Sequence, residues 1–400
     1  MKRLRLEGTC SVYIDSWGVP ERSEMMRFSA RKDMASVLGC LAAAALLITY
    51  APAASAGAVR GLAACGSVIL PAVFPFLTVS VFLAGVPGGE KIAAGLSGIV
   101  RRGFRLPAEA APALLMSWIG GYPAGAKTLV ELKKQGSLTK QEAQNGAVVM
   151  IHSGPAYMVG IVGGGIFGSV RAGLLLFLCQ LAAGLLTARI FASGRAIPAR
   201  RVLPDASRRR EPTAVLLVRS VSSAAGAAVN ICAFVVLLSA FAGALSACGL
   251  FPLLGRGLTI LSGGAVGGEA ADCLLTGLLE ICAGSTKAAA LPPAQAAKLL
   301  PFLLSFGGLS VCCQVAACFG EDALPWGRLL MGRLLHGALT AFLAAPWLGR
   351  TTVQAMTGAA APAFSTGRTL WGSGAMLLLC LLLAARWERG LPEEGIVTGK

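Results

Sequence analysis

Charge is scarce in this chain, and acidic charge is the scarcer kind. Only 14% of the 400 residues are charged, with 35 Lys or Arg against 19 Asp or Glu, so the formal net charge is +16. A soluble domain carries about 25% charged residues, and this chain therefore has too little charge to cover its surface in water. The same shortage argues against nucleic acid as a partner, because a basic binder needs a charged, solvated body.

Metal-ligating and catalytic patterns are lacking as well. Only two histidines are present, and none of the 12 cysteines belongs to a CxxC pair. The sequence therefore predicts no metal site, no cofactor and no disulfide framework. No nucleophile–base pair and no paired catalytic carboxylates stand out, so we do not expect an enzyme.

Apolar residues and glycine are abundant instead. Hydrophobic residues make up 55% of the chain, the mean hydropathy is +0.71, and there are 51 glycines. This composition predicts an all-α polytopic membrane protein whose partner is the lipid bilayer. Apolar segments are expected at 34–51, 65–86, 108–130, 143–166, 170–192, 220–248, 257–283, 296–318, 327–345 and 369–385.

The first apolar segment has two interpretations. A polar, basic stretch at 1–33 precedes it, and Ala54-Ser55-Ala56 follows it, which is the layout of a signal peptide with a cleavage site. The 18 residues of 34–51 are also enough to span a bilayer. We favour a retained first membrane helix or signal anchor over 34–57, because the family pattern described below begins directly after it.

Two apolar segments are broken by glycines and polar residues. Residues 108–130 are interrupted by Gly120-Gly121-Tyr122-Pro123-Ala124-Gly125, and 257–283 by paired glycines and acidic side chains. Broken backbone at membrane depth is tolerated where it is buried in protein or lines a cavity. We therefore interpret each segment as the first arm of a re-entrant hairpin, so that the expected fold has about eight spans and two broken re-entrant hairpins.

The basic residues are distributed asymmetrically about this topology. With both termini cytoplasmic, the inside segments 1–33, 87–107, 132–142, 193–219 and 386–400 hold 24 Lys or Arg. The outside segments 52–64, 249–295 and 346–368 hold five. This agrees with the positive-inside rule and predicts an integral protein of the cell membrane.

Short matches relate the two halves of the chain. Phe76 and Gly85 correspond to Phe234 and Gly243 at an offset of 158 residues, and the topology orients the two segments oppositely. Inverted repeats with discontinuous helices are typical of secondary transporters. The expected domains are a cytoplasmic segment at 1–33, the first helix at 34–57, a first repeat at 58–192, a basic cytoplasmic linker at 193–219, a second repeat at 220–345, and a last helix with a tail at 346–400.

Three motifs leave alternatives open. Gly120–Thr128 imitates a phosphate-binding loop, but Ala126 separates Gly125 from Lys127 and the context is an apolar helix, so we reject nucleotide binding. The motif is either a helix break whose free backbone groups face a cavity or a simple kink at Pro123 and the glycines. Glu280 is either a solute or ion contact or a structural partner of Lys287, since a carboxylate in lipid is costly. The polar interruption at 152–155 either serves the site or contains a packing histidine.

Five segments together resemble the sporulation integral membrane protein YlbJ family, which belongs with the nucleoside-recognition, or Gate, domain membrane proteins. They are 58–85, 117–143, 153–168, 276–284 and 305–314. The resemblance implies a membrane protein of spore-forming bacteria that is linked to cortex formation. Gate relatives include nucleoside transporters and the gate region of ferrous iron transporters. This chain departs from the family pattern at 151–155 and at Cys312-Cys313, where family members carry more polar side chains.

We therefore expect a transporter-like sporulation protein that moves a small polar solute, either nucleoside-like or cortex-related. The alternative is a non-transporting scaffold for assembly of the spore envelope, with other envelope membrane proteins as partners. The predicted substrate-binding residues are Tyr122, Pro123, Gly125, Lys127, Ser153, Glu280, Ser310 and Gln314.

Overall fold

The computed structural model describes residues 30–191, 212–320, 322 and 324–356. Within these ranges the chain forms helices and no strands, which confirms the expected all-helical class. The chain divides after Thr49 into two units. The described part of the first unit is α1 (Ala30–Thr49), which contains most of the predicted run 34–51. The predicted helix at 369–385 and most of the linker 193–219 lie outside the described residues.

The second unit begins with a helical run of 35 residues. It consists of α2 (Ala51–Ala64), a π-helical turn η1 (Cys65–Ile69) and α3 (Leu70–Gly85). Residues 52–64, which the charge distribution counts as an outside segment, are therefore helical and continuous with the next apolar run. This stretch is too rich in alanine and glycine to score as strongly apolar, yet alanine is the best helix former.

The remaining elements follow in two series. The first is α4 (Pro87–Gly95), α5 (Ser97–Ile99), η2 (Val100–Phe104), η3 (Ala108–Ala110), α6 (Ala111–Gly120), α7 (Tyr122–Lys134), α8 (Lys140–Val149), η4 (Ala156–Ile166) and α9 (Val170–Phe191). The second is α10 (Thr213–Ala247), α11 (Leu250–Leu261), α12 (Gly268–Leu279), α13 (Ile281–Ala289), α14 (Pro293–Phe306), α15 (Gly308–Phe319) and α16 (Trp326–Met356).

The order of elements recurs in the two series. Each begins with a helical run of 35 residues, α2–α3 or α10. Each then has a pair of short helices (α6–α7 and α12–α13), a helix broken in its middle (α8–η4 and α14–α15) and a longer helix (α9 and α16). The largest buried apolar cluster draws side chains from both series.

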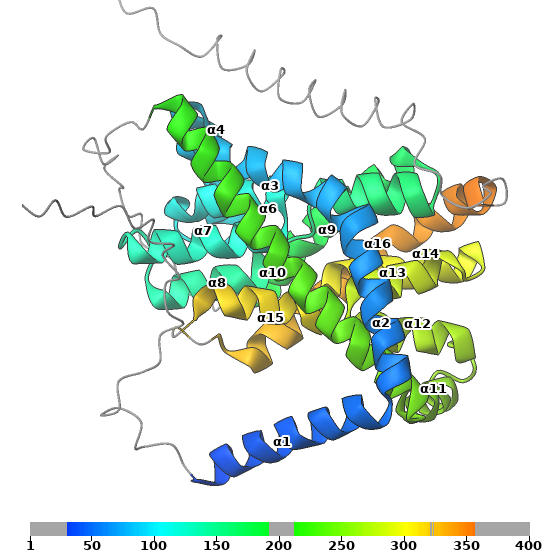
Figure 1. Ribbon diagram of the computed structural model, residues 1–400. Coiled ribbons are helices and arrows are strands. Elements are labelled where there is room, and N and C mark those ends of the chain that lie inside the picture. The colour runs from blue at the N-terminus through cyan, green and yellow to red at the C-terminus, as the bar shows by residue number, and fades with distance from the viewer. Residues whose placement is uncertain (1–29, 192–211, 321, 323, 357–400) are drawn as a thin grey trace, which may run out of the picture. The chain divides into compact units, whose positions relative to one another are not determined.

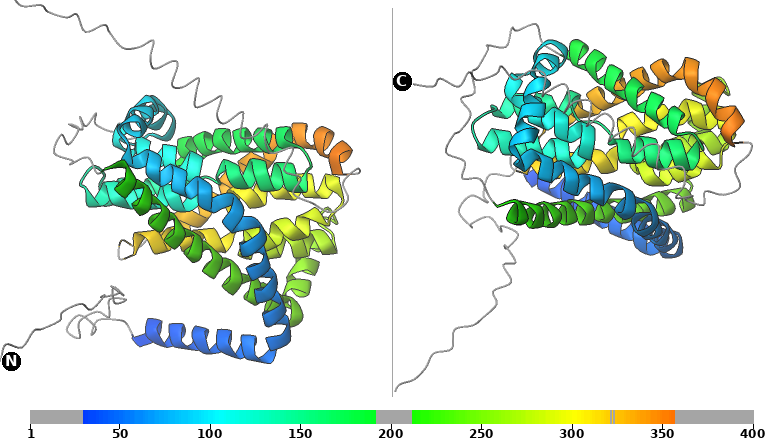
Figure 2. Two further views of the ribbon diagram at one scale, coloured as in Figure 1. Left: turned by 45° about the horizontal axis from the view of Figure 1, so that its top comes forward. Right: turned by 90° about the horizontal axis from the view of Figure 1, so that it is seen from above.

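The two 35-residue runs lie antiparallel along each other. Figure 1 shows α10 descending from the upper left while α2–α3 returns in the opposite direction, and Figure 2 shows the same pair from two other sides. Close contacts fix this direction, because a Cβ on Gly57 would clash with the Ser239 carbonyl and one on Gly85 would clash with Leu216. Small residues permit such close helix packing.

Five helical stretches are long and apolar enough to cross a membrane. They are Ala51–Gly85, Val170–Phe191, Thr213–Ala247, Pro293–Phe319 and Trp326–Leu348. They correspond to five of the eight expected spans, and the other three are not confirmed. The expected span at 143–166 is interrupted between α8 and η4, because residues 151–154 leave the helical conformation.

Candidate functional site

The first pair of short helices folds back on itself at Gly121. This residue separates α6 from α7 with φ +77° and ψ −158°, a backbone conformation that is essentially restricted to glycine. Beyond the turn, a Cβ on Gly125 would lie only 2.8 Å from the Cβ of Ser117. A straight helix would place these two residues about 12 Å apart, so α6 and α7 form a hairpin whose tip is Gly121.

The second pair, α12 and α13, turns at Glu280. Its backbone is extended, with φ −142° and ψ 116°, and its carboxylate accepts hydrogen bonds from the backbone N–H groups of Cys282 (3.0 Å) and Ala283 (2.6 Å). Farther from the tip, Lys287 Nζ donates to Asp272 Oδ2 on the opposite arm at 2.5 Å. Lys287 is thus paired with Asp272, and Glu280 caps α13.

Each hairpin contacts the break in the next helix of its own series. A Cβ on Gly121 would lie 2.9 Å from the backbone N of Gly154, between α8 and η4. In the second series, a Cβ on Gly308, which has φ +74°, would lie 2.9 Å from the carbonyl oxygen of Gly277. Both contacts bring backbone against backbone, which glycine alone permits.

A cavity lies where these tips and breaks converge. About 660 Å³ of empty space lies between its walls, part of it open to the surroundings. Glu280 is the single charged side chain among the described residues that line it. Its lining residues are Ile69, Val73, Phe76, Ile119, Gly120, Gly121, Tyr122, Pro123, Ser153, Gly154, Ala156, Tyr157, Ile231, Val235, Glu280, Ile281, Cys282, Ser310, Val311 and Gln314.

Most of the predicted site residues come together in this cavity. Those that line it are Tyr122, Pro123, Ser153, Glu280, Ser310 and Gln314. Gly125 and Lys127 do not line it: Gly125 packs on Ser117 inside the first hairpin, and the exposed Lys127 donates to Ser223 Oγ on α10 at 2.6 Å.

The sequence analysis missed Tyr157 and the apolar wall that α3 and α10 contribute. Nothing in the sequence separates these wall residues from ordinary membrane-helix positions. Tyr157 had one available signal, since it follows Ser153 by four residues, a spacing that places two side chains on one face of a helix.

The irregular segment 151–154 is held in place by side chains from α9 and α16. Gln180 makes two hydrogen bonds to the backbone of Ser153, accepting from its N–H at 3.1 Å and donating to its carbonyl at 3.0 Å. Arg333, only 1% exposed, donates to the Ile151 carbonyl at 2.6 Å and lies 4.7 Å from the centre of the Tyr122 ring. These contacts satisfy backbone groups that the break in the helix leaves open.

The histidine of the same segment is packed rather than directed into the cavity. His152 is fully buried, and its ring meets that of His336 edge-on at 5.3 Å. His336 Nε2 lies 3.0 Å from the Gln180 carbonyl oxygen. Because His152 is not among the cavity-lining residues, this arrangement favours the packing interpretation of that histidine.

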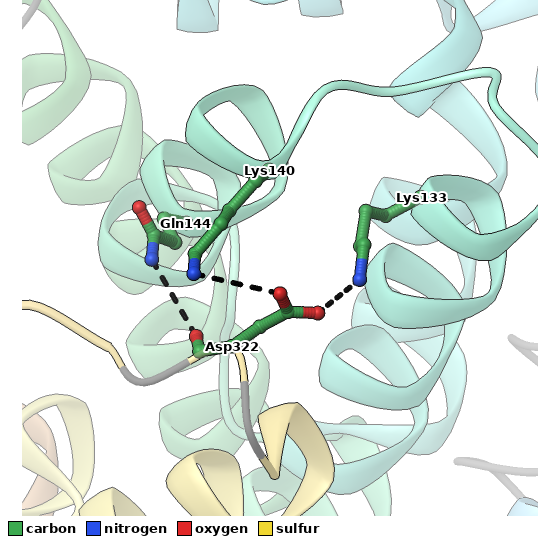
Figure 3. A network of polar contacts seen from close by, with 4 residues as sticks. All are labelled: Lys133, Lys140, Gln144 and Asp322. Atoms are coloured by element: carbon green, nitrogen blue, oxygen red, sulfur yellow. Dashed lines mark hydrogen bonds and ion pairs between the residues drawn. The ribbon is translucent and has the colours of Figure 1, made fainter.

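A separate polar network joins the base of the first hairpin to the second series (Figure 3). Lys133 at the end of α7 pairs with Asp322, which follows α15, and Lys140 Nζ lies 3.6 Å from the other Asp322 oxygen. Gln144 donates to the Asp322 carbonyl at 3.5 Å. The hydrogen bond from Lys133 and the charges of the two lysines hold the pKa of the Asp322 carboxyl below its ordinary value of 3.8.

Comparison with known proteins finds a relative among the sporulation proteins. The chain is 27% identical over 323 residues to the sporulation integral membrane protein YlbJ of Bacillus subtilis strain 168, in an alignment that covers 74% of this chain and 78% of that protein. No family model and no solved structure matches the chain. The similarity supports a relation to the YlbJ family, and the apolar helices fit an integral membrane protein.

Proposed function

From its relation to the sporulation membrane proteins of the YlbJ family, we propose that this chain is a transporter-like protein that moves a small polar solute during spore formation. The family resemblance suggests a nucleoside-like or cortex-related compound. The two series of helices would act as inverted repeats that expose the cavity alternately to the two sides of the membrane.

The convergence of both hairpin tips on one cavity carries this proposal. Transporters built from inverted repeats bind their solutes where discontinuous helices meet near the middle of the membrane. Here the turns at Gly121 and Glu280 and the breaks at Gly154 and Gly308 lie together, although these residues are spread over much of the chain. The antiparallel course of α2–α3 and α10 is the relation expected between the first elements of two inverted repeats.

The network at Asp322 supports the topology in which residues 132–142 lie on the cytoplasmic side of the membrane. Lys133 and Lys140 lie in the segment 132–142 that the charge asymmetry assigns to the cytoplasm. Asp322 follows a span that would end on the cytoplasmic side in this topology, and its ion pairs with the two lysines support that assignment. The pairs join the first hairpin to the second series.

Reconstitution tests the proposal. The purified chain is reconstituted into proteoliposomes, and a panel of nucleosides and cell-wall precursors is tested as solutes. Their flux is compared among the parent, Glu280→Gln and Glu269→Gln. Glu269 is exposed near the start of α12 and does not line the cavity, so its variant controls for loss of a carboxylate. We expect flux of at least one solute, reduced in Glu280→Gln and normal in Glu269→Gln.

A sporulation assay, taken together with the flux measurements, gives the result that would refute transport. If no candidate solute moves and Glu280→Gln cells sporulate normally, while deletion within the linker 193–219 blocks sporulation, the chain acts as a scaffold and transport is refuted. The linker is the matched comparison because most of it lies between the two series in the sequence.

A further inference from the structure

The two hairpin tips offer opposite chemistry to the cavity. At the second tip, Glu280 occupies the N-cap of α13, and its carboxylate accepts hydrogen bonds from the N–H groups of Cys282 and Ala283. At the first tip the N-cap is Gly121, which has no side chain to do this. The corresponding backbone donors of α7 are therefore left uncapped.

The donors at the first tip are the backbone amides that begin α7. Gly125 N–H donates to the Gly121 carbonyl at 3.1 Å, and Pro123 has no N–H. No side chain caps the N–H groups of Tyr122 and Ala124. Since the start of a helix carries a partial positive charge and directs its N–H groups outwards, this tip favours an anionic or acceptor group.

The acceptor at the second tip is the carboxylate of Glu280, which is fully buried. Each of its oxygens accepts one backbone N–H and retains a further lone pair. The nearby cation Lys287 is paired with Asp272 on the far side of the hairpin. A buried carboxylate favours a cationic partner, and the lining of the cavity supplies none among its described residues.

A buried hydroxyl beside these tips adds a second, independent observation. Ser310 lines the cavity and is fully buried, yet its Oγ has no hydrogen-bond partner among the described residues. Buried polar atoms are nearly always hydrogen-bonded in proteins. Ser310 therefore has hydrogen-bonding capacity to offer to a molecule in the cavity.

We propose that the cavity binds a small zwitterionic solute with an apolar body, an amino-acid-like molecule. Its carboxylate is bound at the N-terminus of α7 beside Tyr122, which lines the cavity, its ammonium group by Glu280, and its body by the aliphatic wall that includes Val73, Ile231 and Val311. This proposal rests on the proposed function only in taking the cavity as a solute site.

Binding to the purified full chain in detergent tests the charge requirement, without any need for flux. Four probes are used: leucine, leucinamide, which keeps only the positive charge, N-acetylleucine, which keeps only the negative charge, and uridine as a neutral nucleoside. We expect leucine to bind at least about tenfold more tightly than each of the others, since each probe that lacks a charge loses a charge-assisted hydrogen bond.

Matched variants assign the ammonium group to its site. Glu280→Gln should weaken leucine binding by about tenfold and leave N-acetylleucine binding unchanged, whereas Glu269→Gln should bind all four probes like the parent. Both variants are first compared with the parent by gel filtration and thermal unfolding. If Glu280→Gln does not fold, the probe series on the parent still decides the charge requirement.

Several outcomes overturn the proposal. They are the absence of leucine binding, binding of N-acetylleucine or uridine as tight as that of leucine, and a folded Glu280→Gln variant that binds leucine normally. Uridine flux in the absence of leucine binding would overturn this inference and leave the proposed function intact. Leucine binding without flux of any solute would overturn the proposed function and leave this inference intact.

Discussion

Replacing Gly121 by alanine measures how strongly the first hairpin depends on its tip. Two costs add at this position. Alanine is strained at φ +77° and ψ −158°, at about 1–3 kcal/mol, and its Cβ would lie 2.9 Å from the backbone N of Gly154, which overpacks the contact by about 1–3 kcal/mol. We therefore expect Gly121→Ala to destabilise the chain by about 2–6 kcal/mol.

The matched control is Gly136→Ala. Gly136 also has a positive φ, +73°, but a Cβ there meets nothing within 4 Å. Its substitution should incur only backbone strain, about 1–3 kcal/mol. Thermal unfolding of the purified variants in detergent, followed by loss of the monodisperse gel-filtration peak, ranks them. If Gly121→Ala unfolds at the same temperature as Gly136→Ala or above it, the close contact between hairpin tip and helix break does not contribute to stability.

Two further predictions concern the contacts around the site. The depressed pKa of Asp322 means that its pairing with Lys133 stabilises the chain at neutral pH and is lost as pH falls through that pKa. Asp322→Asn should therefore melt below the parent at neutral pH, and the gap should close as the pH falls below that pKa; an equal gap at neutral and at acid pH would contradict the pairing. Gln180→Ala removes two hydrogen bonds to the Ser153 backbone and should lower stability by about 2–4 kcal/mol in the same unfolding assay. The exposed Gln135→Ala is its control, and equal midpoints would refute the bracing role of Gln180.

The sequence predicts the two interrupted segments, with breaks at 120–127 and 280–287, but glycines mark only one of the two turns. At the first, the glycines at 120–121 mark the break, because the turn needs a conformation that glycine alone adopts readily. At the second, the paired glycines at 263–264 and 267–268 draw attention to a loop before α12. The turn itself lies at Glu280, in an extended conformation open to any residue, and therefore leaves no glycine in the sequence.

Helical geometry explains why Lys127 lies away from the cavity although Tyr122 lines it. Sequence reasoning treated the interruption and the lysine after it as one group. Once α7 begins at Tyr122, each residue advances about 1.5 Å along the axis, so Lys127 is displaced by about 7.5 Å from the tip. It lies on an exposed face of α7, where it meets Ser223 of α10.

The two series of helices share one feature of their hairpins and differ in another. Both hairpins contact the break of the following helix at a glycine, Gly154 in one series and Gly308 in the other, because backbones cannot approach so closely past a side chain. A requirement common to both series points to assembly of the fold. The residue at the tip differs, Gly121 in one hairpin and Glu280 in the other. Gly121 sustains its hairpin through a positive φ and Glu280 through a carboxylate that caps α13, so only the second tip places a charged group in the lining of the cavity.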